Sequence, residues 1–236
     1  MVAPLEAVLG ELDDVDAVVI GGDAVSGPQP AETLQLLRSL ELPTHWIRGN
    51  GERALGPDGA DAVIGEAEEA LRFTASQLSE EDRCELSQLP GTLVLELDGL
   101  GETLFCHASP RNDLDIITPR TPDGRLAMLL EGVSQRVVVA GHTHMQDDRA
   151  VDGARWINPG SVGMPYEGEV AAFWAILGPD VEFRRTPFDV ERSAEALLAS
   201  GWPEAAAFVE ENVRAAVARE EAVELFEQIA VERGER

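Results

Sequence analysis

The alternation of apolar runs and polar breaks along the chain predicts a protein of mixed α/β type. Short runs rich in Val and Ile stop abruptly at glycine, as buried strands do where they give way to loops. We expect such strands at residues 16–20, 44–48 and 136–140. Apolar residues spaced three or four positions apart predict helices at residues 2–13, 30–40 and 123–132. Because a helix separates the first two strands, we expect those strands to pair in parallel through a right-handed crossover.

The remaining segments add antiparallel strands and further helices. Residues 93–97 and 103–106 flank the turn sequence Asp98-Gly99-Leu100-Gly101, which predicts a hairpin. We expect further strands at residues 154–157, 170–177 and 181–186. We expect further helices within residues 60–89, at 189–200 and at about 203–232. Strands of both directions with flanking helices predict an α/β sandwich of packed sheets covered by helices.

The composition is that of a globular protein with a sizeable core. The chain has 236 residues, of which 44% are hydrophobic and 26% are charged. No apolar run reaches the ~18 residues that a transmembrane helix needs, and the N-terminal residues lack the basic segment of a signal peptide. Two cysteines are too few for a disulfide framework. We therefore expect a cytoplasmic protein with no membrane partner, and the sequence leaves its oligomeric state open.

The net charge of −26 restricts the class of partner. A field of this sign repels long polyanions, so we expect no bulk nucleic acid as a partner. It permits a small phosphorylated substrate, because bound divalent cations invert the sign of the field locally. Many acidic residues lie in the last helical segment, where they predict a solvated surface. We accordingly divide the chain into a domain at residues 1–200 and an acidic helical extension at residues 201–236.

Four side chains able to bind a metal ion follow directly after predicted strands. They are Asp23, Asn50, His107 and His142. Because ligands of open α/β sheets bind at the carboxyl ends of the strands, we expect these side chains to meet at one edge. Imidazole, carboxylate and amide oxygen together suit Mn²⁺, Fe, Zn²⁺, Co²⁺ or Ni²⁺ better than Ca²⁺.

Each of these motifs has a common structural explanation when it is taken alone. Gly22-Asp23 after a strand is usually a turn, and Gly49-Asn50-Gly51 is usually a tight turn because Asn and Gly accept positive φ. A single histidine such as His107 more often satisfies a hydrogen bond than binds a metal. Gly141-His142-Thr143-His144 is more specific, since two imidazoles flank one residue directly after a strand. The order of the motifs along the chain is more informative than any one of them.

That order resembles the calcineurin-like metallophosphoesterase family. The residues that carry the resemblance are Asp23, Asn50, His107, His142 and His144, against a family pattern of Asp-x-His, Gly-Asp, Gly-Asn, His and Gly-His-x-His. The resemblance covers roughly residues 1–190. It is nearest to the small bacterial phosphodiesterase branch, to which the segments Gly22–Pro28 and Ile157–Gly163 are similar. It implies a four-layer α-β-β-α sandwich of two mixed sheets flanked by helices.

The resemblance also implies a role for each residue of the site. Asn50, His107 and His142 complete the coordination of one ion, and Asp23 bridges it to a second. His144 binds the second ion together with the family's Asp-x-His motif. Two ions ~3.5–4 Å apart hold a hydroxide that attacks phosphorus, and the ion we expect is Mn²⁺. The expected substrate-binding residues are Arg53, Ser109 and Arg111, with a surface charge as the alternative role for Arg53.

Two departures from the family pattern change these expectations. No strand with an Asp-x-His motif precedes the first helical segment, so the first strand of the pattern is missing here. Either Met1 lies downstream of the true start or the chain is naturally shortened, and we favour the first alternative. A full-length form would hold two ions, whereas this sequence would hold one and leave His144 as a partial site. In addition, some family members carry a histidine where Gly51 stands, and losing such a general acid costs about 10²–10⁴-fold.

These expectations define one main hypothesis and two alternatives. The main hypothesis is a metal-dependent phosphoesterase that hydrolyses a phosphodiester bond of a small substrate with a metal-bound hydroxide. Because a missing acid affects poor leaving groups most, diesters and aryl esters are favoured over unactivated alkyl monoesters. The first alternative is a catalytically impaired or inactive binding protein of the same fold, motivated by the missing motif. The second is a one-metal hydrolase or nuclease, which the net charge of −26 disfavours for polymeric substrates.

Overall fold

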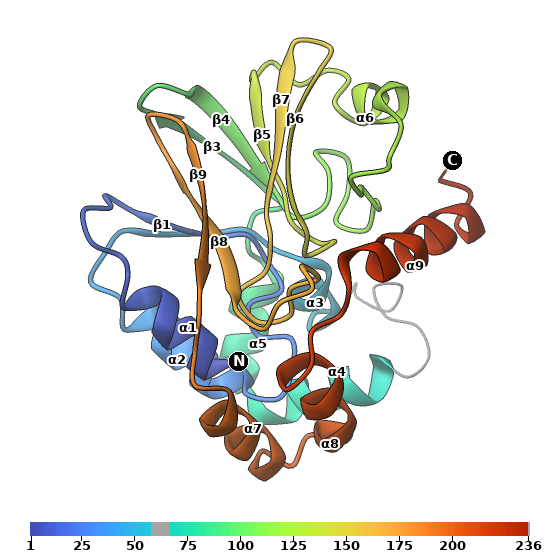
Figure 1. Ribbon diagram of the computed structural model, residues 1–236. Coiled ribbons are helices and arrows are strands. Elements are labelled where there is room, and N and C mark those ends of the chain that lie inside the picture. Colours follow the sequence, from blue (N-terminus) through green and yellow to red (C-terminus); the bar gives the residue numbers. More distant parts are fainter. Residues whose placement is uncertain (58–66, 236) are drawn as a thin grey trace.

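Helices surround three β-sheets in the computed structural model, which describes residues 1–57 and 67–235 (Figure 1). The largest sheet has the strand order β3-β4-β5-β7-β6. Its strands are β3 (Thr92–Leu97), β4 (Gly101–Cys106), β5 (Val137–Val139), β6 (Gln146–Val151) and β7 (Ala154–Pro159). The strands β4, β5 and β7 run parallel in the middle, while β3 and β6 pair antiparallel at the two edges. This sheet confirms the predicted hairpin and the predicted mixed α/β fold.

Two smaller pairs of strands lie beside the large sheet. β1 (Val18–Ile20) pairs in parallel with β2 (Thr44–Trp46), as the helix between them predicts. β8 (Ala172–Leu177) pairs antiparallel with β9 (Val181–Thr186). In the described part of the chain no strand joins β1 to β8, so the second expected sheet is present as two separate pairs.

One side chain of β6 forms hydrogen bonds that link the β8–β9 pair to the large sheet. The Nε2 group of Gln146 lies 3.2, 3.0 and 3.2 Å from the carbonyl oxygens of Pro159, Trp174 and Arg184. These acceptors belong to β7, β8 and β9, so the two N–H bonds of one amide join three strands. Buried backbone carbonyls need such donors where no neighbouring strand supplies them.

The helices lie outside the strands, and the core alternates between the two faces of the large sheet. The helices are α1 (Val2–Leu9), α2 (Pro30–Arg38), α3 (Asn50–Ala54), α4 (Ala67–Gln77), α5 (Glu80–Ser87), α6 (Asp123–Leu129), α7 (Val190–Ala199), α8 (Ala205–Phe208) and α9 (Arg219–Glu232). On one face Val138 and Trp156 pack with residues of α6, and Cys106 is buried among them. On the other face Phe105 and Ile157 pack against residues near β2. Successive side chains of a strand point to opposite faces, which explains this division.

Two predicted helices differ from the structure. The helix expected at residues 2–13 ends at Leu9, where Gly10 caps it before a polar stretch. The region expected to be helical at about 203–232 is interrupted, because α8 continues into a π-helical turn at Val209–Val213 and α9 begins only at Arg219. The π-helical turn buries its valines beside α7, a packing requirement that apolar periodicity does not reveal.

Further differences concern elements that the sequence pattern does not predict. The residues of β6 are mostly polar. The start of α3, with Gly49 as its N-cap, has the sequence Gly49-Asn50-Gly51, which is typical of a turn. Residues 60–66 of the helical region expected at 60–89 lie outside the described residues, and the described remainder contains α4 and α5.

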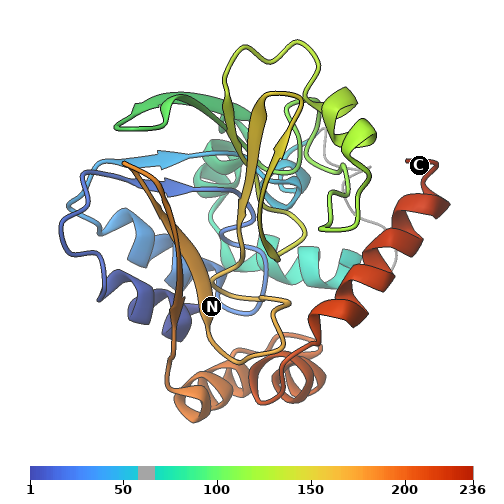
Figure 2. The same ribbon diagram turned by 45° about the horizontal axis from the view of Figure 1, so that its top comes forward.

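The C-terminal helix α9 runs along one side of the molecule, opposite α1 and α2 (Figure 2). Its residues Ala222 and Val223 are buried against Met145, so α9 is packed on the rest of the chain. The expected boundary at residue 200 stays a prediction. No helix in the described residues is long and apolar enough to cross a lipid bilayer.

Candidate metal centre

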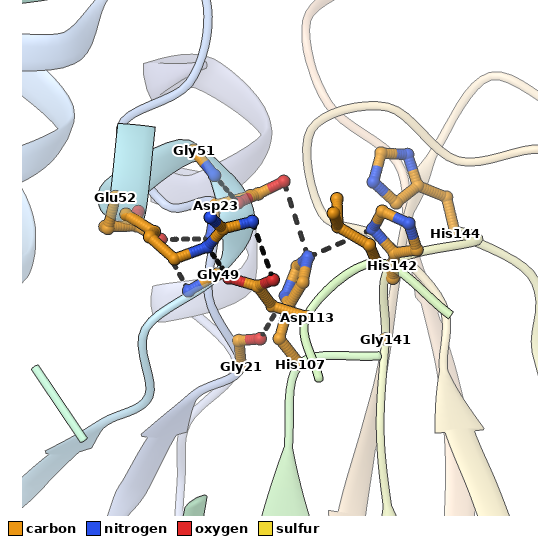
Figure 3. A network of polar contacts seen from close by, with 12 residues as sticks. Gly21, Asp23, Gly49, Gly51, Glu52, His107, Asp113, Gly141, His142 and His144 are labelled. Carbon is orange, nitrogen blue, oxygen red and sulfur yellow. Dashed lines mark hydrogen bonds and ion pairs between the residues drawn. The ribbon is translucent and has the colours of Figure 1, made fainter. Parts of the chain in front are cut away.

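Loops at the carboxyl ends of the strands carry the predicted metal ligands (Figure 3). Asp23 follows β1, and Asn50 begins α3 after β2. His107 follows β4, and His142 follows β5. The structure brings together Asp23, His107 and His142, each of which offers a ligand atom within 4.8 Å of the other two. Parallel strands end at the same edge of the fold, which is why residues far apart in the sequence meet here.

Hydrogen bonds to carbonyl oxygens orient the imidazoles of the site. His107 Nδ1 lies 2.8 Å from the carbonyl oxygen of Gly21, which can only accept a hydrogen bond. Nδ1 of His107 therefore carries a proton, and Nε2 faces Asp23 Oδ2 at 3.4 Å. Nε2 donates to that carboxylate when the ring is charged and offers its lone pair to a metal when the ring is neutral. His142 Nδ1 lies 3.2 Å from the same Nε2 atom. Two ring nitrogens and a carboxylate oxygen thus surround one position.

The charges of the site are strongly coupled. Burial opposes a charge on His107, but the Asp23 carboxylate, together with the Gly21 carbonyl oxygen and Glu52, raises the pKa of His107 to about 9. Burial, followed by the positive charge of His107, lowers the pKa of His142 to about 3. Burial also opposes the charge of Asp23, yet the attraction of His107 keeps its pKa below the ordinary value. In the absence of a metal, one proton therefore supplies the positive charge that this group requires.

Asn50 provides an independent indication that the site fits a metal ion. Its side-chain Oδ1 atom is buried and has no hydrogen-bond partner in the described residues. A buried acceptor without a partner costs about 1–3 kcal/mol, so such atoms are rare unless an ion or water satisfies them. The neighbouring Gly51 donates its N–H to Asp23 Oδ1 at 2.7 Å, which ties Asn50 to the same site. Imidazole nitrogens with carboxylate and amide oxygens fit a divalent transition-metal ion.

Backbone strain is concentrated in the same residues. Asp23, His142 and His144 have φ angles of 54°, 66° and 59°, in the left-handed region that residues with a Cβ rarely adopt. Strained residues persist only where the surrounding structure holds them, and they cluster at functional sites. Here Asn158 holds the histidine turn, because its Nδ2 donates to the carbonyl oxygen of Gly141 at 2.9 Å.

Glycines allow the ligand loops to approach one another. A Cβ on Gly49 would lie 2.2 Å from Asp23 Oδ1, and a Cβ on Gly22 would lie 2.6 Å from His107 Nδ1. A Cβ on Gly51 would lie 2.0 Å from Ser26 Oγ. The same Cβ would lie 3.0 Å from Asp23 Oδ1, so the backbone at Gly51 also lies close to the Asp23 carboxylate.

Glu52 is a functional candidate that the sequence analysis does not identify. Its carboxylate is only 1% exposed and accepts hydrogen bonds from the N–H groups of Asp23 at 2.7 Å and Gly49 at 2.9 Å. It also accepts a longer bond of 3.4 Å from Val25. Burial, followed by the charge of Asp23, raises the pKa of Glu52. A glutamate three residues after a helix cap is the signal of a capping box, which could have indicated this role.

The predicted substrate-binding residues occupy different environments. Arg53 forms a two-pronged ion pair with Asp113, with distances of 2.6 and 3.0 Å, and each side chain is 16% exposed. Ser109 is buried and donates its hydroxyl to Asp115, whereas Arg111 is exposed. The guanidinium of Arg53 is therefore held in place by a carboxylate, a contact that the sequence does not predict.

His144 lies outside the close group of ligand atoms. Its Nδ1 lies 2.8 Å from the carbonyl oxygen of Met164, so its Nε2 carries the free lone pair. Burial lowers the pKa of His144, which favours the neutral form that binds metals. Its ring stacks on Tyr166, with centroids 5.4 Å apart and an angle of 20° between the planes.

Known proteins resemble this chain in sequence and in fold. A family model, that of the calcineurin-like phosphoesterase superfamily domain, matches residues 1–177. The structure of a hypothetical protein from Pyrococcus horikoshii OT3 is similar with a TM-score of 0.76 and 22% identity, over 88% of this chain and 92% of the other. That of a metallophosphoesterase from Sphaerobacter thermophilus has a TM-score of 0.69 and 28% identity, over 90% and 93%. No curated protein matches the sequence.

Proposed function

This chain belongs to the calcineurin-like phosphoesterase superfamily, and from that premise we propose that it is a metal-dependent phosphoesterase acting on a small phosphorylated substrate. The observation that carries the proposal is the convergence of ligand atoms from Asp23, His107 and His142 within 4.8 Å. The Oδ1 atom of Asn50 supports it, because this buried atom has no hydrogen-bond partner among the described residues and a metal ion would provide one.

The residues proposed to hold the ion are Asp23, Asn50, His107 and His142. A bound divalent ion would neutralise charge on a phosphate group and lower the pKa of a coordinated water. We propose Mn²⁺ as the ion, with Fe, Zn²⁺, Co²⁺ and Ni²⁺ as the ions that the same donors accept. His144 is proposed as a partial second site. Its Nε2 lone pair is free to bind an ion, but no group of three candidate ligands among the described residues includes His144.

The protein contributes orientation and the placement of protons. The carbonyl oxygen of Gly21 keeps the proton of His107 on Nδ1, so that Nε2 is available as a ligand. Gly51 brings no side chain that could protonate a leaving group. We therefore propose a phosphodiester or aryl ester as the substrate, because such groups depart with less help from an acid.

Charge argues for a small substrate. The net charge of −26 repels extended polyanions, whereas a small phosphoester needs only local attraction. Arg53, Ser109 and Arg111 remain the proposed substrate-binding residues. Arg111 is the exposed cation of this set, and Arg53 would bring a guanidinium whose direction is fixed by Asp113.

A second candidate function is a catalytically impaired binding protein of the same fold. The observation in its favour is that one group of three metal-binding residues, without His144, occurs in the described part of the chain. A one-ion site binds phosphate but lacks the second ion that clamps the attacking and leaving oxygens. Metal uptake without turnover distinguishes this function from the first.

The test is hydrolysis of bis(4-nitrophenyl) phosphate with Mn²⁺ by the wild-type chain and by Asp23→Asn and His142→Ala. We expect metal-dependent turnover in the wild type and a loss of about a hundredfold or more in both variants. His45→Ala is the matched control, because His45 lies within β2 and is not one of the grouped ligand residues, and it is expected to keep wild-type activity. Turnover that survives both ligand substitutions would show that this site does not carry the reaction. Metal uptake without turnover would support the binding protein.

A further inference from the structure

The C-terminal helix α9 contacts both segments that support the histidine turn at residues 142–144. One segment contains Tyr166, and the other contains Ile117 and Thr118. The proposed function assigns no role to α9 or to these contacts. They connect the end of the chain to the metal centre through side chains.

The first connection runs through a stack of aromatic rings. The ring of Tyr166 stacks on His144, and the backbone N–H of Tyr166 donates to the carbonyl oxygen of His144 at 3.1 Å. On its other side, Tyr166 contacts Phe226 of α9, with ring centroids 5.8 Å apart and an angle of 57°. The orientation of the His144 ring therefore depends on Tyr166, and the position of Tyr166 depends on α9.

The second connection runs through hydrogen bonds to the middle of the turn. The hydroxyl of Thr143, which lies between the two histidines, donates to the carbonyl oxygen of Ile117 at 2.8 Å. The adjacent Thr118 donates its hydroxyl at 2.5 Å to Glu227 of α9, a carboxylate that is only 8% exposed. A hydrogen bond to a carboxylate is roughly twice as strong as one between neutral groups, so this contact holds Thr118 firmly against α9.

Ion pairs and hydrogen bonds hold both ends of α9 against the rest of the chain. Arg219, in its first turn, forms an ion pair with Glu167 and donates to the carbonyl oxygen of Gln146 at 2.6 Å. Beyond its last turn, Glu235 accepts the N–H of Ile116 at 3.0 Å and binds Arg125 at 2.7 Å. Such anchoring lets α9 act as a rigid support.

The turn needs such support because its two histidines are strained. His142 and His144 both have positive φ angles, of 66° and 59°, and a backbone of this kind relaxes unless its surroundings hold it. We propose that α9 positions the metal-binding turn, with Phe226 acting on His144 through Tyr166 and Glu227 acting on Thr143 through Thr118. The inference rests on the proposed function, since it assigns α9 to the same metal site.

The decisive comparison is between Phe226→Ala and Leu225→Ala. Leu225 is the adjacent residue of the same helix and is 56% exposed, so it controls for the loss of an apolar side chain from α9. Mn²⁺ affinity is measured by calorimetry, and the ring protons of His144 are followed by NMR in the metal-free protein. We expect Phe226→Ala to shift the His144 signals, because the stacked ring moves. It should also weaken Mn²⁺ binding about 10–100-fold, because the same strained turn carries the ligand His142. Leu225→Ala should change neither.

A second pair of variants keeps the test valid if Phe226→Ala does not fold. Thr118→Val removes the hydroxyl bound to Glu227, and Thr118→Ser retains it. We expect weaker Mn²⁺ binding for valine and rescue by serine. Unchanged affinity and unchanged His144 signals in Phe226→Ala, with a wild type that binds Mn²⁺, would overturn this inference alone. A wild type that binds no Mn²⁺ would overturn the proposed function together with it.

Discussion

Replacing Glu52 by alanine is expected to destabilise the fold and loosen the metal centre at the same time. The Glu52 carboxylate joins two ligand loops, because it accepts the N–H of Asp23 at 2.7 Å and that of Gly49 at 2.9 Å. It is only 1% exposed, so water does not replace it freely. Alanine would remove the acceptor from both N–H groups and from the more distant N–H of Val25.

The expected cost follows from counting the lost partners. Each buried N–H without an acceptor costs about 1–3 kcal/mol, so the two short bonds account for about 2–6 kcal/mol. Part of this is offset because burial, and then the charge of Asp23, makes the Glu52 carboxylate costly in the wild type, as its raised pKa indicates. We therefore expect the free energy of unfolding to fall by about 3 kcal/mol, which corresponds to a Tm lower by about 6–12 °C.

Urea denaturation of the metal-free protein measures this change directly. Glu81→Ala is the control, since Glu81 is an exposed glutamate in the first turn of α5. The control should change the free energy of unfolding by no more than about 0.5 kcal/mol. The Glu52→Ala protein should also bind Mn²⁺ more weakly, because Asp23 loses a backbone contact. A cost below about 1 kcal/mol, or a cost equal to that of the control, would refute this account of Glu52.

Three further predictions test other parts of the site. Gly49→Ala would place a Cβ 2.2 Å from Asp23 Oδ1 and should weaken Mn²⁺ binding at least about tenfold. A Cβ at Gly91 would meet no atom of the described residues within 4 Å, so Gly91→Ala should have no effect in the same titration. The pKa of His107 is raised to about 9, and a histidine must be neutral to bind a metal, so His107 must lose a proton on binding. Calorimetry should therefore show Mn²⁺ affinity rising about tenfold per pH unit between pH 6 and 8. A flat profile would contradict this. Asp113→Asn should lower the free energy of unfolding by about 1–3 kcal/mol in urea, because it removes the charge from the two-pronged ion pair with Arg53. A change below about 0.5 kcal/mol would contradict the pairing.

The sequence predicts the strands that deliver the site better than it predicts the rest of the chain. Buried runs such as the one at β5 end at glycine, so the residues that follow them can be placed at the edge of a sheet without a structure. This reasoning locates Asp23, His107 and His142, which the structure brings within 4.8 Å of one another. The polar strand β6 escapes it because that strand lacks the apolar alternation of a half-buried strand.

The contacts that support the ligands depend on tertiary structure and are not visible in local patterns. Glu52 is an ordinary acidic residue in sequence, and only the approach of two loops makes it a shared acceptor. Likewise, Phe226 is one apolar residue of an acidic helix, and its contact with Tyr166 bridges 60 positions of the chain. Loop approach of this kind follows from packing, whereas sequence periodicity reports only which face of an element is buried.

The most direct measurement is an anomalous difference map from crystals of the wild-type chain soaked in Mn²⁺. We expect the strongest peak to lie among the side chains of Asp23, Asn50, His107 and His142. The same map from the His142→Ala protein should show that peak weakened or lost. A wild-type map with peaks only at surface carboxylates, and none among these four side chains, would contradict the central claim that they hold the metal ion.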